Sequence, residues 1–141
     1  MKLSARTRYA VRILVKLGRH GTDSPLKTTS LSESSGVSVQ FIEQILRPLK
    51  KAGLITSMRG AAGGHMLAKT PDTISVGDVI RIMEGHVGLT ACCDKKLADD
   101  CPRKEFCTTR SVWMKASQVL ENELNSISLQ DIIDGKVHPI E

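Results

Sequence analysis

The stretch LSESSGVSVQFIEQILRPLKKAGLI, residues 31–55, predicts two helices joined by a tight turn. Gly36 permits that turn, and Ser38 is a favourable N-cap for a longer second helix over residues 39–52. The apolar residues of this second helix recur at helical spacing: Phe41, Ile42, Ile45, Leu46 and Leu49. Pro48 lies inside the helix and is expected to strain or kink it.

The segments around this stretch complete a recognisable order of elements. Residues 6–18 have helical periodicity, and residues 28–35 form the short helix before the turn. Residues 54–58 and 65–68 are typical of strands, and the glycine-rich loop 59–64 joins them. Helix, short helix, glycine turn, helix, strand, loop and strand is the order of a winged helix-turn-helix. We therefore expect a mainly helical protein with a small β-hairpin, whose third helix enters the major groove of DNA.

The rest of the chain predicts further parts. A helix over residues 75–83 completes an expected DNA-binding domain, residues 1–83. Residues 84–100 look irregular, and residues 84–107 form the expected cysteine-bearing cluster loop. The last two parts are a helical region, residues 103–133, with a long helix to about Ile127 and a short C-terminal one, and a loose tail, residues 134–141.

Five exposed positions early in the third helix are candidate DNA contacts: Ser38, Gln40, Glu43, Gln44 and Arg47. The glutamines are suited to reading adenine, and Arg47 to guanine or phosphate. Glu43 can accept a hydrogen bond from cytosine. It is the weaker candidate, because phosphates repel a carboxylate unless a positive charge pairs with it. For each position the alternative is an ordinary solvated side chain.

The loop between the two strands adds Arg59 and Gly60. An arginine at the wing tip suits a narrow minor groove, and the glycines around it permit close approach. The alternative is a flexible hairpin with an incidental arginine. A nucleotide-binding loop is excluded, because no lysine follows the glycines at P-loop spacing.

Composition supports a polyanionic partner. The 141 residues carry a formal net charge of +5, and 40% are hydrophobic although only 3% are aromatic, which favours helices with aliphatic faces. Residues 1–60 hold eleven Lys and Arg but only three Asp and Glu. No segment has the roughly 18–20 apolar residues of a membrane span, and Arg12 and Lys16 interrupt the apolar N-terminus. We therefore expect a cytoplasmic protein without membrane contact.

All four cysteines lie in TACCDKKLADDCPRKEFCTTRSVW, residues 90–113. The spacing is C-x8-C-x5-C counted from Cys92 and C-x7-C-x5-C counted from Cys93, unlike the paired C-x2-C of zinc ribbons. Thiolates gathered in a loop before a helix suit an anionic iron–sulfur cluster. Zinc, a metal-free thiol switch and purely structural cysteines stay open as alternatives.

Taken together, these motifs resemble the family of cluster-sensing regulators that includes IscR, NsrR and CymR, with the IscR branch the most similar. The resemblance covers almost the whole chain, and the matching stretches are MKLSARTRYAV (1–11), FIEQIL (41–46), KKAGLITSMRGAAGG (50–64), ISVGDVI (74–80), the spaced cysteines and ISLQDII (127–133). It implies a homodimer that crosses its long C-terminal helices, binds palindromic double-stranded DNA and changes operator affinity with its cluster.

The resemblance also implies a ligand set. Cys92, Cys101 and Cys107 are the expected cluster ligands, with Cys93 possible and the cluster either 2Fe–2S or 4Fe–4S. Where the IscR type has a histidine, three residues after the last cysteine, this chain has Arg110, which cannot ligate. Where the NsrR type has an aspartate, it has Arg8. The fourth ligand is therefore the extra cysteine of the Cys92–Cys93 pair, an acid or histidine such as Asp94 or His86, or an exchangeable small molecule.

The function predicted first is thus a cluster-controlled transcription regulator. The alternative is a metal-free regulator of the same family that senses cysteine oxidation or a protein partner, as its CymR-like branch does. An enzyme is not expected, because the sequence has no nucleophile–base motif and no nucleotide fingerprint.

Overall fold

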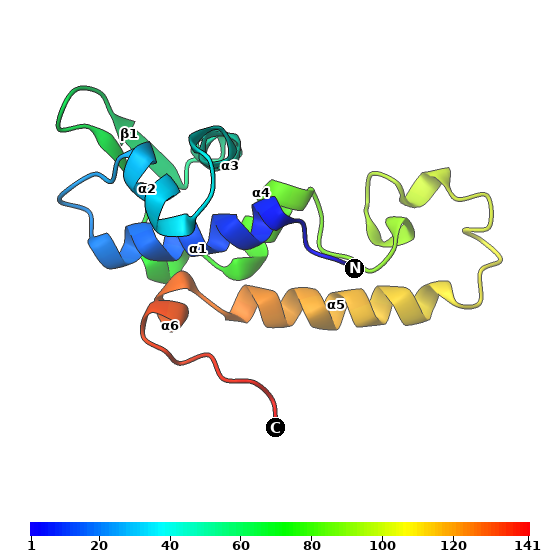
Figure 1. Ribbon diagram of the computed structural model, residues 1–141. Helices are drawn as coiled ribbons and strands as arrows, with labels where there is room; N and C mark the ends of the chain where they lie inside the picture. Colours follow the sequence, from blue (N-terminus) through cyan, green and yellow to red (C-terminus); the bar gives the residue numbers. More distant parts are fainter.

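A computed structural model describes all residues 1–141, and it is mainly helical with one β-hairpin (Figure 1). The elements are α1 (Ala5–His20), α2 (Thr28–Ser35), α3 (Val39–Lys51), β1 (Ile55–Met58), β2 (Gly64–Leu67), α4 (Val76–Glu84), α5 (Arg110–Ser126) and α6 (Leu129–Ile133), with three short 3₁₀ turns between them. Helices α2 and α3 follow one another across Gly36, and the hairpin comes next, so the predicted winged helix-turn-helix is confirmed.

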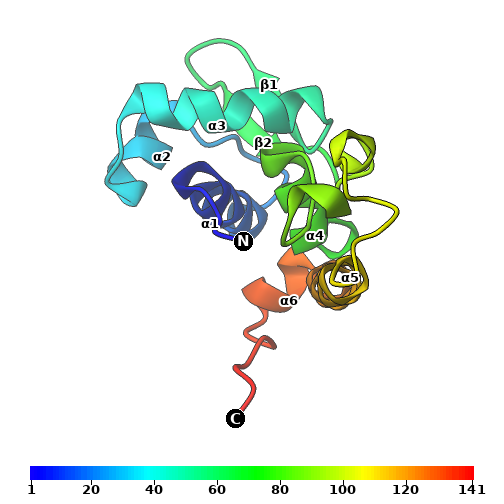
Figure 2. The same cartoon turned by 90° about the vertical axis from the view of Figure 1, so that its right-hand side faces the viewer.

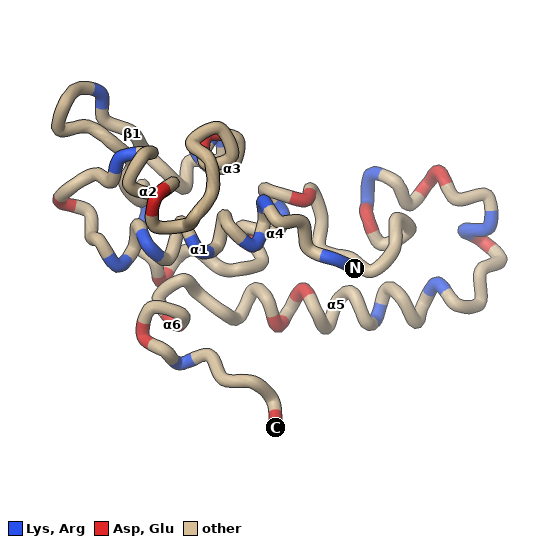
Figure 3. The backbone as a smooth tube through the Cα atoms, in the orientation of Figure 1, with Lys and Arg blue, Asp and Glu red and all other residues tan.

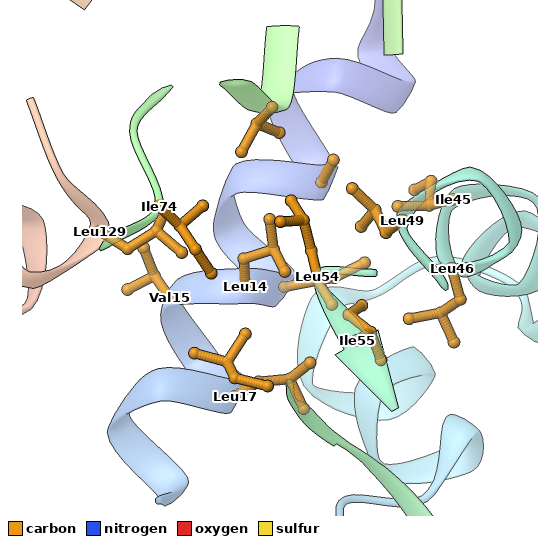
Figure 4. Packing of buried hydrophobic residues seen from close by; sticks show 14 of the residues in the cluster. Leu14, Val15, Leu17, Ile45, Leu46, Leu49, Leu54, Ile55, Ile74 and Leu129 are labelled. Atoms are coloured by element: carbon orange, nitrogen blue, oxygen red, sulfur yellow. The ribbon is translucent and has the colours of Figure 1, made fainter. Parts of the chain in front are cut away.

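The core forms around α1, which lies between α3 and the C-terminal helix α6 (Figure 4). Its side chains are almost entirely aliphatic, as the low aromatic content predicts. Those labelled in the figure are Leu14, Val15, Leu17, Ile45, Leu46, Leu49, Leu54, Ile55, Ile74 and Leu129. Full burial of each such side chain contributes about 1.5–3 kcal/mol, so this packing holds α3 and the wing in a fixed relation.

Local signals in the sequence set the limits of these helices. The Ser38 side chain accepts a hydrogen bond from the Phe41 N–H at 3.1 Å and so caps α3. Gly36 has φ +67°, the left-handed conformation that the turn before α3 requires. Helix α3 runs through Pro48 to Lys51, so the proline does not end it.

The hairpin is fixed to the start of α2. Strands β1 and β2 pair antiparallel, from Ile55 opposite Leu67 to Met58 opposite Gly64. Leu26 forms a β-bridge with His65, and a Cβ added at Gly64 would lie only 2.5 Å from the Leu26 carbonyl oxygen. The glycine is thus required by a close approach of two backbones, which sets the base of the wing.

The long C-terminal helix differs from its predicted extent, because α5 begins at Arg110 and not at Arg103. Residues 102–106 form turns, and Pro102 lacks the backbone N–H that regular helices use. Cys107, Thr108 and Thr109 follow, and such residues have weak helix propensity. The cysteine segment, defined here as residues 85–109, therefore reaches the first turn of α5.

Helices α5 and α6 pack differently, although the prediction grouped them in one region, residues 103–133. Helix α5, seen nearly end-on in Figure 2, packs beside α4 at the margin of the domain and buries only Ser117. Helix α6 packs on α1, and Leu129 is fully buried in the core. The short helix therefore belongs with the winged-helix core.

None of the helices has the length and apolar character to cross a membrane.

Candidate DNA interface and cysteine segment

The five residues predicted to contact DNA, on α3 and at its N-cap, are all exposed: Ser38, Gln40, Glu43, Gln44 and Arg47. The opposite face of α3 is buried through its aliphatic residues. Positions 40, 43, 44 and 47 are separated by three or four residues, so their side chains share one face of the helix. The structure thus brings these residues together on a surface open to a large partner.

A polar groove beside this face adds a residue that the sequence prediction missed. Arg6, from the first turn of α1, lines the groove together with Ser4, Gln44 and Arg47. The charge count of residues 1–60 includes Arg6, but no periodicity connects it with α3, so only the packing of α1 against α3 reveals it. The groove places two guanidinium groups, of Arg6 and Arg47, where phosphates of a DNA backbone can lie.

Glu84, at the end of α4, lies at the edge of the same groove. Its Oε1 accepts from the Ser4 backbone N–H at 2.9 Å and from the Thr7 hydroxyl. Partial burial raises the pKa of Glu84, but the hydrogen bonds from Thr7 and Ser4 outweigh burial and leave the pKa below its ordinary value. The negative carboxylate therefore stabilises the N-terminus of α1 and connects it with the end of α4.

The wing is held against α2 and α3 by His65. Its Nε2 pairs with the Thr28 hydroxyl and its Nδ1 with the Ser57 hydroxyl, both at 2.8 Å. Burial, then the charge of Lys50, lowers the pKa of His65, with Glu43 opposing, so the neutral imidazole is favoured. The sequence predicts His65 only as a hairpin residue, since neither partner is near it in the chain.

At the other end of the wing, Arg59 and Gly60 follow β1 and are exposed, as expected. Gly60 has φ +104°, which suits a tight tip. None of the salt bridges includes Arg6, Arg47 or Arg59. Basic positions prevail across the winged-helix part, whereas acidic and basic positions alternate along the cysteine segment (Figure 3). The unpaired arginines make this surface suited to a polyanion.

The cysteine segment holds the second group of predicted residues. Cys92 and Cys93 lie on a 3₁₀ turn, Ala91–Cys93, with the Thr90 hydroxyl 3.0 Å from the Cys92 sulfur and 3.3 Å from the Cys93 sulfur. Cys101 follows another 3₁₀ turn, Ala98–Asp100. Cys107 lies just before α5, and the Thr109 hydroxyl is 3.5 Å from its sulfur. All four thiols are free and partly exposed.

Hydrogen bonds favour thiolate at two of these positions. Partial burial raises the pKa of Cys93, but hydrogen bonds from Ser117 and Thr90 outweigh it and lower the pKa. The Thr109 hydroxyl, with its backbone N–H, lowers the pKa of Cys107, and the nearby Arg110 charge adds to this. Thiolates are the form in which cysteine binds metals and reacts with oxidants.

The segment fits an iron–sulfur group in the chemistry of its donors but does not gather them. Four free thiols occur within sixteen residues, positions 92–107. Beside Cys107, the Nε of Arg110 is buried without a hydrogen-bond partner, so an acceptor of negative character is lacking there. No three His, Cys, Asp or Glu side chains converge on one point. His86 and Asp94, both considered as the fourth ligand, pair with each other at 3.5 Å.

Comparison with known proteins places the chain in a family. Residues 3–135 match Rrf2, described as an iron-dependent transcriptional regulator. Protein rrf2 of Nitratidesulfovibrio vulgaris is 36% identical over 133 residues, which are 94% of this chain and 87% of that protein.

Two solved structures share the whole architecture. IscR of T. potens superposes with a TM-score of 0.76 at 34% identity, over 97% of this chain and 89% of the other. CymR of B. subtilis, the global cysteine regulator of that bacterium, superposes with a TM-score of 0.76 at 31% identity, over 95% and 97%.

These relatives are transcriptional regulators, so the expectation that the chain is no enzyme is confirmed. Both predicted relationships, to IscR and to CymR, are confirmed as well. From its fold and its similarity along nearly its full length, the chain belongs to the Rrf2 family of DNA-binding transcriptional regulators.

Proposed function

We propose that this regulator, acting in the cytoplasm, binds an iron–sulfur cluster through its cysteine segment and that the cluster sets its affinity for operator DNA. The observation that carries the proposal is the set of four free, partly exposed thiols in one segment between α4 and α5. The family is described as iron-dependent, and IscR is among the structural relatives. Cys92, Cys101 and Cys107 would hold the cluster, 2Fe–2S or 4Fe–4S, which supplies an iron–sulfide group that responds to oxidants.

On the DNA side, α3 enters the major groove and presents Gln40 and Gln44 to base edges. Ser38 and Glu43 lie beside them, and Arg47 reaches guanine or phosphate. Arg59 and Gly60 at the wing tip approach the minor groove, where a narrow groove attracts an arginine. Arg6 contributes a phosphate contact from the side of α1.

The regulator acts as a homodimer, and α5 supplies the contact. Only one residue of this helix is buried in the single chain, while four large apolar side chains are exposed: Val112, Trp113, Met114 and Val119. Soluble proteins seldom leave such an apolar surface uncovered. Two α5 helices that cross would set the distance between two recognition helices, and half-sites of a palindromic operator lie about 34–36 Å apart or a multiple of this.

The first test is anaerobic purification of the full chain, followed by an absorbance spectrum and by iron, sulfide and zinc analysis. We expect visible thiolate-to-iron absorption with iron and sulfide in matching amounts. Binding to candidate operator DNA is then compared before and after the cluster is removed, and we expect the affinity to change. A protein that stays colourless after reconstitution and holds no iron would refute cluster control and leave the DNA-binding role intact.

The alternative is a metal-free regulator that responds to cysteine oxidation or a protein partner, and two observations favour it. The thiols do not converge, and the chain is similar in structure to CymR. The same analysis distinguishes the two, since a metal-free regulator is colourless and its DNA affinity changes with a thiol oxidant alone. Zinc without sulfide would indicate a structural metal site instead.

A further inference from the structure

The first turn of α1 carries positive charge where helices favour negative charge. Its N-cap is Ser4, whose hydroxyl accepts a hydrogen bond from the Thr7 N–H at 3.2 Å. Arg6 and Arg8 lie in the sequence at this turn, which has no acidic residue. Because the N-terminus of a helix bears a partial positive charge, two arginines there are unfavourable for the helix. The sequence therefore keeps basic side chains at this end of α1 at the expense of helix stability.

Glu84 supplies the missing negative charge from another helix. It is the last residue of α4, and Figure 1 shows this end of α4 beside the start of α1. One carboxylate oxygen, Oε1, accepts hydrogen bonds from both the Ser4 backbone N–H, at 2.9 Å, and the hydroxyl of the fully buried Thr7. A carboxylate is unfavourable at the C-terminal end of its own helix, so its stabilising effect falls on α1 and not on α4.

The same carboxylate lines the groove that also contains Arg6 and Arg47. A negative group at this place would repel phosphates, unless it had another task. Neither arginine forms a salt bridge with Glu84, whereas its Oε1 is bonded to the start of α1. The two guanidinium groups therefore stay available for DNA, although a carboxylate lies in the same groove.

We propose that Glu84 is a positioning residue for DNA binding: it holds the first turn of α1 so that the Arg6 guanidinium stays in the groove and contacts a phosphate there. The inference rests on the proposed DNA contact of Arg6 and deepens it. Glu84 itself does not touch DNA, and its effect passes through Arg6. A side chain on a fixed turn loses less conformational freedom when it binds, so loosening the turn weakens binding.

This role predicts an effect opposite in sign to simple charge repulsion. If Glu84 only repels phosphates, removing its carboxylate strengthens DNA binding. If it positions Arg6, removing the carboxylate weakens DNA binding instead. Glutamine separates the two effects, because Glu84→Gln removes the charge but keeps a side-chain oxygen that can accept both hydrogen bonds.

The test is titration of a labelled DNA duplex of arbitrary sequence with the full chain, repeated at several salt concentrations. A phosphate contact does not depend on base sequence, so the measurement needs neither a known operator nor a bound cluster. The variants are Glu84→Ala, Glu84→Gln, Arg6→Ala and the double variant Arg6→Ala/Glu84→Ala. Glu33→Ala, at an exposed position of α2, is the matched control for the loss of one carboxylate from the winged-helix part.

We expect Glu84→Ala to weaken binding about fivefold, the effect of one lost hydrogen bond. Like Arg6→Ala, it should lower the slope of log affinity against log salt by about 1. Glu84→Gln should bind as tightly as the natural protein or more tightly, and Glu33→Ala should bind no more weakly than it. The double variant should bind no more weakly than Arg6→Ala, because Glu84 acts through Arg6.

Thr7 keeps the test decisive if Glu84→Ala does not fold. Thr7→Val retains most of the buried side chain but removes the hydroxyl that donates to Glu84. It should weaken DNA binding less than fivefold, because the hydrogen bond from the Ser4 N–H remains. Thr7→Ser restores the hydroxyl and should recover the affinity of the natural protein.

Unchanged or tighter binding in Glu84→Ala would overturn the proposal, and Thr7→Val decides in the same way if Glu84→Ala does not fold. A double variant that binds more weakly than Arg6→Ala would also overturn it, as would equal weakening in Glu84→Gln and Glu84→Ala. Failure of the proposed function gives different results. A natural protein without iron refutes cluster control and leaves this titration valid. An Arg6→Ala variant with unchanged affinity and salt slope removes Arg6 from the DNA surface, and the positioning role falls with it.

Discussion

Replacing His65 by alanine tests whether the wing is held by one buried side chain. The imidazole is only 9% exposed and makes two hydrogen bonds of 2.8 Å, to Thr28 on α2 and Ser57 on β1. A hydrogen bond contributes about 1 kcal/mol net to stability, so His65→Ala should lower the free energy of unfolding by about 2 kcal/mol. Both partners are hydroxyls at partly exposed residues, which water can satisfy, and a larger loss is not expected.

The assay is urea unfolding of the apoprotein at fixed concentration. With a slope of about 2 kcal/mol per molar urea, the midpoint should fall by about 1 M. His138→Ala is the matched control, because His138 is exposed in the tail and should leave the midpoint unchanged. An unchanged midpoint in His65→Ala would refute the assignment of the wing contact to this side chain.

The same pair of proteins tests the protonation of His65. Its pKa lies below the ordinary value of 6.5 in the folded chain, because burial and the charge of Lys50 disfavour the imidazolium. The unfolded chain therefore takes up the proton first as pH falls through 6.5, which weakens folding. The natural protein should lose stability below this pH. The difference in free energy of unfolding between the natural protein and His65→Ala should therefore become smaller. If this difference in free energy of unfolding stays constant from pH 8 to pH 5, the pKa of His65 is not lowered in the folded chain.

Further changes test the DNA surface, the dimer and the cluster. Arg59→Ala should weaken operator binding by about 1–3 kcal/mol in gel-shift titration while iron content stays the same. Arg6→Ala should weaken binding to all DNA sequences alike and reduce the slope of log affinity against log salt by about 1. Val119→Glu, at a site 62% exposed in the single chain, should yield monomers in sedimentation. Arg110→His should add a ligand where the IscR type has histidine and slow the loss of visible absorbance in air.

Each of these outcomes has a clear opposite. Loss of iron in Arg59→Ala would show that the two halves are not separate in function. A sequence-dependent effect of Arg6→Ala would make it a base contact, and an unchanged salt slope would remove it from the interface. Dimers of Val119→Glu would place the interface elsewhere. Faster loss of absorbance in Arg110→His would show that the guanidinium stabilises the cluster.

The sequence predicts the DNA-binding half well because its signals are local. Gly36 and Ser38 determine a turn and a cap within a few residues, and the apolar periodicity of α3 leaves the polar positions on one face. Arg59 follows a strand directly, so its place at the wing tip also depends only on neighbours in the chain. For such features the sequence pattern and the packing agree.

The features that sequence reasoning missed depend on contacts between distant segments. Arg6 lines the groove beside α3 only because α1 packs against α3, and His65 contacts Thr28 only because the wing folds back on α2. The sequence pattern predicts the start of α5 at Arg103, seven residues too early, because the helical periodicity gives no sign of the turns at residues 102–106. Leu129 lies in the predicted helical region 103–133, and no local signal indicates that its side chain fills the core beside α1.

The cysteine segment is held at its start to elements that matter for the regulator. It leaves α4 after Glu84, whose carboxylate accepts hydrogen bonds from the start of α1, next to Arg6. Five residues later the Leu89 backbone N–H donates a hydrogen bond to Ser117 on α5, the helix with four exposed apolar side chains. The cysteines follow both contacts and their thiols do not converge, so a group that gathered them would move the segment beyond Leu89. Because each contact is a single hydrogen-bonded group, worth about 1–3 kcal/mol, losing one would change a coupled equilibrium at least severalfold without unfolding the domain.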